Sequence, residues 1–273
     1  MAIAQKGLRR YMKKIPVAMT IAGSDSCGGA GIEADLKTFA AFDVYGTAVI
    51  TSVTAQNTKE VRAVHDIPSE IVGDQINAVL DDIAVDSVKT GMLSNSDIIE
   101  IVAQKIDEWE LQVVVDPVMV TKSGDQLIED EAVEKYINEM VPRSFILTPN
   151  IRETEKLTDI KVGSIEDMKE AAKRLQEMGA ENIVVKTGEA GDKVVDIFYD
   201  GKNFREIYGE KFTSHKHGTG CTFSSAITAN LAKGKSVREA VNIGKKFIDD
   251  AIKNGLDIGE GEKPVDHMVW SRD

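Results

Sequence analysis

The sequence predicts an α/β fold of three layers, in which a mostly parallel central sheet has helices on both faces and an antiparallel hairpin at one edge. From residue 16 onward, apolar runs of strand length alternate with segments whose apolar residues recur at helical spacing. Most of the runs are dominated by apolar residues and do not alternate with polar ones, which is typical of parallel strands buried on both faces. No repeat, low-complexity tract or linker interrupts residues 15–273, so these are expected to form a single domain.

The expected parallel strands are short segments rich in valine, isoleucine and threonine. They cover residues 15–21, 48–55, 85–90, 113–115, 145–148 and 183–186. Two further apolar segments, Val194–Tyr199 and Phe204–Tyr208, flank Asp200 and Gly201. Because Asp-Gly favours a tight hairpin turn, these two segments are expected to pair antiparallel at the sheet edge, near the glycine-rich turn at residues 217–221.

The expected helices lie between the strands, and each has an apolar face. They cover residues 32–42, 71–83, 98–109, 165–178, 222–231 and 237–252. Ser164 is placed to cap the fourth of these helices, and Ser236 with Glu239 forms a capping box for the last. The segment 222–231 consists of small and apolar residues without a charge, which predicts a buried helix.

Composition and charge restrict the classes of function. With 273 residues, of which 42% are hydrophobic and 29% charged, the chain can bury a substantial core. A net charge of -12 argues against nucleic-acid binding, which requires a basic surface, and no apolar run is long enough to cross a bilayer. The two cysteines, Cys27 and Cys221, are too few for a disulfide framework and suit a reducing cytoplasm.

The first 14 residues differ from the rest, because they contain five basic residues and no acidic one. They are expected to be a flexible extension before the first strand. A targeting signal or a helix that touches a membrane surface is the alternative.

A glycine-rich turn, His217-Gly218-Thr219-Gly220-Cys221, runs directly into the small, apolar helix. Such a turn at a helix N-terminus points backbone N–H groups at one spot, where the helix dipole favours an anion such as phosphate. Cys221 would lie in the same field, so its thiol is expected to ionise more easily than that of a free cysteine. The alternative is an ordinary turn with a small, packed cysteine.

Polar residues follow several of the predicted strands, where ligands bind in open parallel sheets. Asp116 and Glu153 could hold Mg²⁺ through water, although a loop acid or a helix cap is the alternative for each. Lys186 ends an apolar strand and would need an anion there, either a nucleotide phosphate or a nearby acid. Phosphoryl transfer needs a cation to neutralise developing charge, a cradle for the transferred group and an oriented nucleophile, and the sequence offers candidates for all three.

A second glycine-rich turn, Gly23–Gly31, lies between a predicted strand and helix. Its glycine pattern is imperfect for dinucleotide binding, and Gln56 stands where a ribose-binding acid is expected. A Gly-x-x-x-x-Gly-Lys-Ser/Thr motif is absent from the sequence. Asp35 and Gln56 could hydrogen-bond the edge of a small heterocycle, but Asp35 taken alone is expected at a solvated helix position. His217 is assigned no acid-base role.

Long, ordered motifs also carry a resemblance that runs from about Val17 to His267. They are Ala22–Lys37, Thr54–Thr58, Thr90–Leu93, Asp116–Met119, Thr148–Asn150 and His217–Cys221. Together they resemble the hydroxymethylpyrimidine/phosphomethylpyrimidine kinases of thiamin biosynthesis, which belong to the ribokinase-like superfamily. The resemblance implies an enzyme that uses ATP and Mg²⁺ to phosphorylate 4-amino-5-hydroxymethyl-2-methylpyrimidine and then its monophosphate. It also implies a homodimer.

The same resemblance assigns roles to residues of this sequence. It implies that Asp116 and Glu153 serve the metal and that Asn150 and Lys186 contact the nucleotide phosphates. The anion hole would be formed by Gly218, Thr219, Gly220 and Cys221, with Cys221 in the place of the aspartate base of related sugar kinases. The pyrimidine pocket would be lined by Gly23, Asp35, Gln56, Met92 and Val118.

Three positions depart from the family pattern. Cys27 stands where serine is common, Arg152 where proline is common, and Thr187 where a glycine usually follows the lysine. The competing functions are a pyridoxal or pyridoxine kinase on the same scaffold, and a binding protein that senses a pyrimidine without turning it over. The presence of Asp116 and Lys186 argues against the second.

Overall fold

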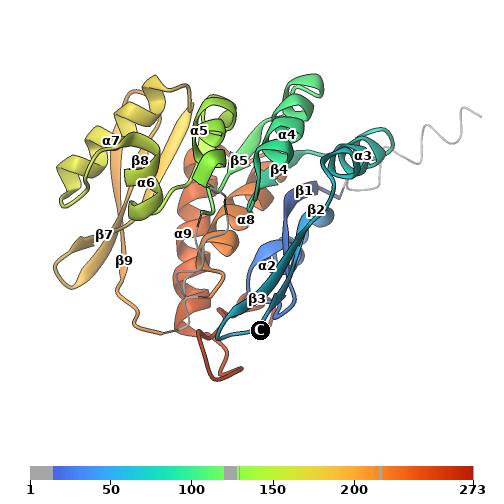
Figure 1. Cartoon of the computed structure of the whole chain (residues 1–273). Helices are drawn as coiled ribbons and strands as arrows, with labels where there is room; N and C mark the ends of the chain where they lie inside the picture. The colour runs from blue at the N-terminus through green and yellow to red at the C-terminus, as the bar shows by residue number, and fades with distance from the viewer. Residues whose placement is uncertain (1–14, 120–127, 129, 215–216, 273) are drawn as a thin grey trace, which may run out of the picture.

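The computed structural model describes residues 15–119, 128, 130–214 and 217–272, and the predicted N-terminal extension lies outside them. Within this part of the chain, nine strands form one sheet in the order β3-β2-β1-β4-β5-β6-β7-β8-β9 (Figure 1). The strands are β1 (Val17–Asp25), β2 (Tyr45–Gln56), β3 (Val61–Asp66), β4 (Ser87–Thr90), β5 (Val113–Val115), β6 (Ser144–Leu147), β7 (Asn182–Ala190), β8 (Lys193–Tyr199) and β9 (Phe204–Glu210).

The centre of the sheet is parallel and both of its edges are antiparallel. Neighbours from β2 through β1, β4, β5 and β6 to β7 pair in parallel. β7, β8 and β9 pair antiparallel, which confirms the predicted edge hairpin. β3 pairs antiparallel with β2 and was not predicted. Its central residues, Arg62–His65, are exposed, so no apolar run marks this strand in the sequence.

Helices cover both faces of the sheet (Figure 1). On one face, α3 to α7 pack against apolar residues of β1, β4 and β5. On the other face, α2, α8 and α9 pack against the opposite side of the same strands. The helices are α2 (Gly31–Ala41), α3 (Ser69–Leu80), α4 (Ser96–Glu108), α5 (Asp130–Glu139), α6 (Ile151–Thr158), α7 (Ile165–Glu177), α8 (Thr219–Ala232) and α9 (Val237–Lys253).

The helix caps follow the sequence signals. Ser164 accepts a hydrogen bond from the Asp167 amide at the start of α7, and Ser236 with Glu239 forms the predicted capping box of α9. α8 is buried over most of its length, because its small residues fit between α2, α9 and the sheet. Among the described residues, no helix combines the length and the apolar character that a bilayer span requires.

Candidate active site

A cavity of about 410 Å³ lies where the carboxyl ends of the parallel strands meet the start of α8. Residues at or just beyond the carboxyl ends of β1, β2, β4, β5 and β6 contribute to its wall, as expected for an open parallel sheet. Lys186 and Thr187 contribute from within β7. Every residue predicted for the site lines it, with the exception of Asp35. These residues are Gly23, Gln56, Met92, Asp116, Val118, Asn150, Glu153, Lys186, Gly218, Thr219, Gly220 and Cys221.

The glycine-rich turn supplies free amide groups to this cavity. Gly218 is the N-cap of α8, with a φ of 80°, and no side chain caps the helix. A Cβ atom at Gly218 would lie 1.7 Å from the carbonyl oxygen of Gly29, so the two glycine-rich turns are in direct backbone contact. The first amides of α8 therefore have no partner within the helix and can bind an anion.

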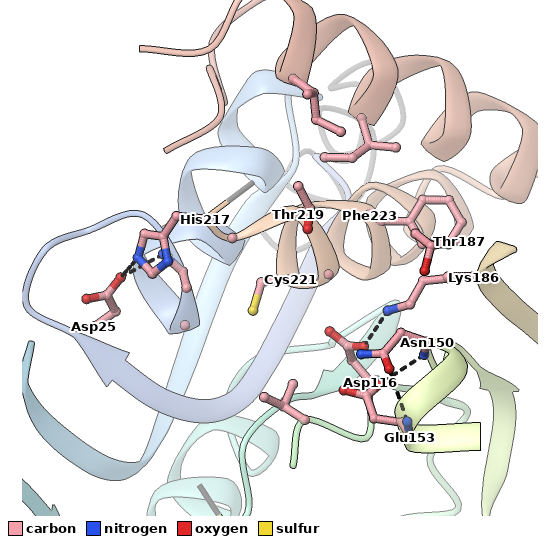
Figure 2. Close-up of a pocket in the computed structure, with 18 of the residues that line it drawn as sticks. Asp25, Asp116, Asn150, Glu153, Lys186, Thr187, His217, Thr219, Cys221 and Phe223 are labelled. Atoms are coloured by element: carbon pink, nitrogen blue, oxygen red, sulfur yellow. Dashed lines mark hydrogen bonds and ion pairs between the residues drawn. The ribbon is translucent and has the colours of Figure 1, made fainter. Parts of the chain in front are cut away.

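The start of α8 faces a buried ion pair. A Cβ atom at Gly220 would lie 3.2 Å from Asp116 Oδ2 and 3.5 Å from Lys186 Nζ. Lys186 Nζ itself is 2.9 Å from Asp116 Oδ1, as Figure 2 shows. The amide cradle, a cation and a carboxylate thus meet across one small space.

Each member of this pair keeps the other charged. Burial alone would raise the pKa of Asp116, but the charges of Lys186 and Lys89 outweigh it and lower that pKa. Burial would likewise lower the pKa of Lys186, yet Asp116 raises it. Thr148 and Ser224 also donate hydrogen bonds to the Asp116 carboxylate. A nearby acid, which was one of the two predicted partners for Lys186, is therefore present.

Asn150 and Glu153 form the capping box of α6. The Asn150 side chain accepts from the Glu153 amide at 3.0 Å, and Glu153 Oε2 accepts from the Asn150 amide at 2.8 Å. Glu153 therefore caps a helix, which was the predicted alternative to a role as a metal ligand. Both residues still line the cavity, and Glu153 is buried.

A second part of the cavity wall combines apolar side chains with one amide. A larger residue at position 23 would press on Met92, because a Cβ atom at Gly23 would lie 3.0 Å from the Met92 methyl group. Gln56 and Val118 lie in the same wall. The Gln56 side-chain oxygen accepts a hydrogen bond from Thr54, which orients its amide. This part of the wall offers the Met92 thioether and one oriented amide to a small ring.

Asp35 does not occupy a solvated helix position, so that expectation is wrong. The side chain is fully buried, and both carboxylate oxygens lie 2.8 Å from Lys89 Nζ. Thr20 and Ser225 donate further hydrogen bonds of 2.6 Å. The carboxylate therefore joins α2 to β1, β4 and α8 beneath the cavity. The sequence alone suggests a surface position for Asp35, because it does not show that Lys89 lies next to this carboxylate.

The expected easy ionisation of Cys221 is also wrong. Burial raises the pKa of this thiol to about 11, with Asp35 and Asp116 adding to the effect, although Lys89 opposes it. The helix N-terminus is present as predicted, but desolvation of the thiolate is the larger effect. At neutral pH the thiol keeps its proton.

Several contacts within the cavity wall were not predicted from the sequence. Asp25 and His217 form a buried pair, with Asp25 Oδ2 2.8 Å from His217 Nε2. Thr187 has a φ of 65°, a strained value for a β-branched residue, and its amide donates to Asp196 at 2.7 Å. A further apolar end of the cavity comes from the hairpin and α9 as well as α8, and no local motif marks it in the sequence. Its residues are Val194, Phe223, Ile248 and Ile252.

An amide cradle beside a buried lysine and carboxylates defines the site of a phosphotransferase. The chain belongs to the phosphomethylpyrimidine kinase family, whose model matches residues 25–266. A hydroxymethylpyrimidine/phosphomethylpyrimidine kinase of Bacillus subtilis is 46% identical over 259 residues, which cover 93% of this chain and 96% of the relative.

Two solved structures are similar to the whole fold. An ADP complex of Bacillus subtilis pyridoxal kinase matches with a TM-score of 0.88 and 38% identity, over 95% of this chain and all of the other. A phosphomethylpyrimidine kinase of Clostridium difficile matches with a TM-score of 0.79 and 43% identity, over 88% of this chain and all of the other. The predicted ribokinase-like fold is confirmed by these matches.

Proposed function

We propose that this kinase transfers a phosphoryl group from ATP to the hydroxymethyl group of 4-amino-5-hydroxymethyl-2-methylpyrimidine and then phosphorylates the monophosphate to the diphosphate. The observation that carries the proposal is the position of the α8 amides opposite Lys186 and Asp116 in a single cavity. A transferred phosphoryl group needs such donors around its oxygens. The full-length similarity to a kinase of this name supports the choice of substrate.

The two ends of the cavity suit the two substrates. The pyrimidine would lie against Met92 and Val118, with its polar edge toward the Gln56 amide. Adenine would lie at the apolar end near Phe223 and Ile252, which would place the phosphates of ATP toward the α8 amides. The ADP complex of the similar pyridoxal kinase supports ATP as the donor.

Carboxylates at the centre of the cavity fit Mg²⁺. Asp116 and Glu153 are buried oxygen donors of the same cavity, the ligand type that this ion prefers. Glu153 already caps α6, so the ion would contact it through water. When bound, Mg²⁺ would neutralise charge on the phosphates. Lys186 would exchange part of its contact with Asp116 for a phosphate oxygen, while Asn150 holds the adjacent turn.

Cys221 would orient the acceptor hydroxyl rather than remove its proton in advance. Its thiol is protonated at neutral pH, since its pKa is raised to about 11. Phosphoryl transfer is loose and depends little on early proton removal, so positioning and electrostatics can supply most of the acceleration. Asp35 would act indirectly, by holding α8 through Ser225.

A pyridoxal kinase is the second candidate, and the TM-score of 0.88 with an enzyme of that activity favours it. The test is release of ADP from ATP with three acceptors supplied separately: hydroxymethylpyrimidine, its monophosphate and pyridoxal. The proposal predicts turnover with the first two at a higher kcat/KM than with pyridoxal. A higher kcat/KM with pyridoxal would reverse the assignment, and tight binding without ADP release would indicate a binding protein.

Two further predictions concern the protein as a whole. A homodimer is proposed from the resemblance, and sedimentation of the full chain would test it against a monomer. A cytoplasmic location is proposed because the two cysteines, Cys27 and Cys221, are both free. Fractionation of cells that produce the chain would test this proposal.

A further inference from the structure

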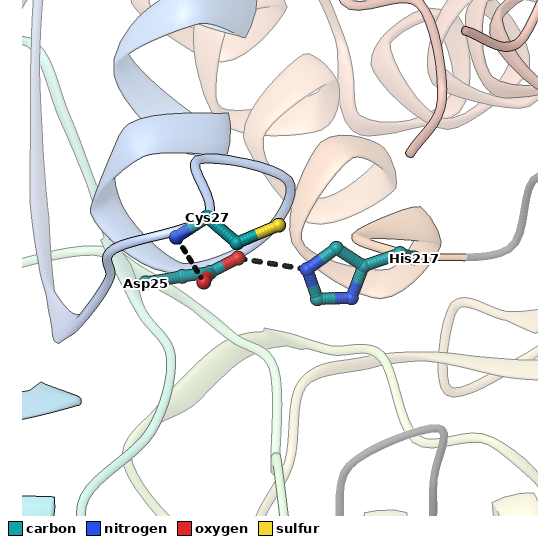
Figure 3. A group of neighbouring side chains, drawn as sticks. All are labelled: Asp25, Cys27 and His217. Carbon is teal, nitrogen blue, oxygen red and sulfur yellow. Dashed lines mark hydrogen bonds and ion pairs between the residues drawn. The ribbon is translucent and has the colours of Figure 1, made fainter. Parts of the chain in front are cut away.

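Three side chains from the two glycine-rich turns converge at the wall of the catalytic cavity (Figure 3). One potential ligand atom each from Asp25, Cys27 and His217 lies within 4.8 Å of the other two. Asp25 and Cys27 belong to the end of β1 and the turn that follows it, and His217 directly precedes the N-cap of α8. Asp25 and His217 are buried, whereas Cys27 is partly exposed and can be reached from solvent.

The backbone holds two of these three groups in place. Asp25 Oδ1 accepts from the Cys27 amide at 2.9 Å, and Oδ2 accepts from the amides of Gly29 and Ala30. The His217 ring packs so closely on the same turn that a Cβ atom at Gly29 would lie 2.1 Å from it. The carboxylate and the imidazole are thus held close together, and Cys27 lies beside them in the same turn.

A carboxylate, an imidazole and a thiolate are a donor set that zinc uses in proteins. With metal–ligand distances of about 2.0–2.3 Å, tetrahedral geometry places such atoms about 3.2–3.8 Å apart, so small movements complete the site. We propose that Asp25, Cys27 and His217 bind a thiophilic divalent cation of the Zn²⁺ class, with water as the fourth ligand. The two negative charges of carboxylate and thiolate balance the charge of the ion.

Binding at this site has a defined proton balance. The Cys27 thiol loses its proton to solvent as the sulfur binds the ion, and His217 carries its remaining proton on Nδ1. Burial and the Asp25 carboxylate raise the pKa of the Cys27 thiol, and Lys37, whose ammonium group donates to the Gly28 carbonyl in the same turn, offsets only part of this. The ion itself must therefore stabilise the thiolate. Mg²⁺ prefers oxygen donors and keeps much of its water, so it does not compete well for a sulfur and nitrogen site.

The site lies at the joint between the two glycine-rich turns. Ligation replaces the Asp25–His217 hydrogen bond, and His217 is next to Gly218, which touches the Gly29 carbonyl. A bound ion would therefore shift the turn that forms the amide cradle. We expect Zn²⁺ to lower kinase turnover through this contact.

Co²⁺ is the probe for the first test, added to the full-length protein without nucleotide. The wild type is expected to show thiolate-to-cobalt charge transfer in the near ultraviolet and the strong visible bands of tetrahedral Co²⁺. Cys27→Ser should lose the charge-transfer band. Its Zn²⁺ affinity, measured by competition, should fall by more than about 100-fold, because even the loss of a residue that only supports a ligand costs about 10–100-fold.

Cys221→Ser is the matched control, since it removes the other thiol of the chain and should keep the cobalt spectrum. The proposal would be overturned by a wild-type spectrum without a thiolate band, by a band that survives Cys27→Ser, or by a band that Cys221→Ser removes. These spectra require no substrate, so they stand apart from the choice between pyrimidine and pyridoxal.

Kinase turnover in buffered Zn²⁺ gives the second readout. Cys27→Ser should keep wild-type turnover in metal-free buffer with Mg²⁺ and ATP restored, because serine is almost the same size as cysteine and Cys27 does not line the cavity. Zn²⁺ should then inhibit the wild type at concentrations that leave Cys27→Ser active. Equal inhibition of both proteins would show that Zn²⁺ inhibits from another site, and would refute the proposed link between the Cys27 site and kinase turnover.

Discussion

Gly218→Ala tests the contact that positions the amide cradle. Gly218 has a φ of 80°, and the new Cβ atom would lie 1.7 Å from the Gly29 carbonyl oxygen, whereas ordinary contacts begin at 3.4 Å. The left-handed conformation costs an alanine about 1–2 kcal/mol. The clash adds a shift of the turn by more than an ångström, because the obstructing atom is backbone and cannot rotate away.

A shift of this size at the cradle should reduce kcat strongly. A displacement of about 1 Å in a catalytic group can cost about 100-fold in rate, so we expect a loss of at least about that factor. The assay is ADP release at saturating substrate, with the free energy of unfolding measured by urea denaturation on the same samples.

Gly234→Ala provides the matched control at the other end of α8. Gly234 has a φ of 76°, but a Cβ atom at this position would meet nothing within 4 Å. This variant should lose about 1–2 kcal/mol of stability while its kcat stays close to wild type. If Gly218→Ala turned over as fast as Gly234→Ala, the argument that the turn positions the phosphoryl group would be refuted.

Three other substitutions test separate parts of the structure. Cys221→Ala should lower kcat by about 100-fold with little change in substrate Kd, because the thiol orients the hydroxyl and contributes little to binding. Near-normal turnover of this variant would remove Cys221 from the mechanism. Thr187→Gly should raise the free energy of unfolding, measured by urea denaturation, by up to about 1 kcal/mol, because it relieves a φ of 65°. An unchanged free energy of unfolding would mean that Thr187 is unstrained. His267→Asn should weaken the loss of stability in acid. Burial lowers the pKa of His267 to about 4 from 6.5, so between those pH values the unfolded chain binds a proton that the folded chain does not. By pH 4 this difference costs the wild type about 3 kcal/mol relative to pH 7, and parallel pH curves for the two proteins would contradict it.

The central parallel strands could be predicted from sequence because apolar runs mark them, and the edge hairpin because Asp200 and Gly201 mark its turn. β5, for example, consists of three fully buried valines, Val113–Val115, and its apolar run marks it directly. β3 lies at a sheet edge with most of its residues exposed, so its pairing with β2 depends on the fold and leaves no local pattern. α5 and α6 were not predicted either, although the capping box of α6 begins at Asn150 and was available as a signal.

The amide cradle could be predicted because its cause is local. A glycine-rich turn followed by a helix fixes the direction of the backbone amides wherever the helix lies in the fold. The state of Cys221 and the place of Asp35 could not be predicted, since both depend on burial and on Lys89, which comes from a different strand. Electrostatic behaviour therefore required the tertiary structure even where the motif was clear.

A crystal structure of the chain with Mg²⁺, ADP, fluoroaluminate and hydroxymethylpyrimidine would test the central claim most directly, because fluoroaluminate stands in for the phosphoryl group during transfer. The account predicts that its fluorine atoms lie within hydrogen-bonding distance of the amides of Gly220 and Cys221, with Lys186 on the opposite side. Fluoroaluminate bound away from the start of α8, with those amides facing only water or apolar side chains, would contradict it.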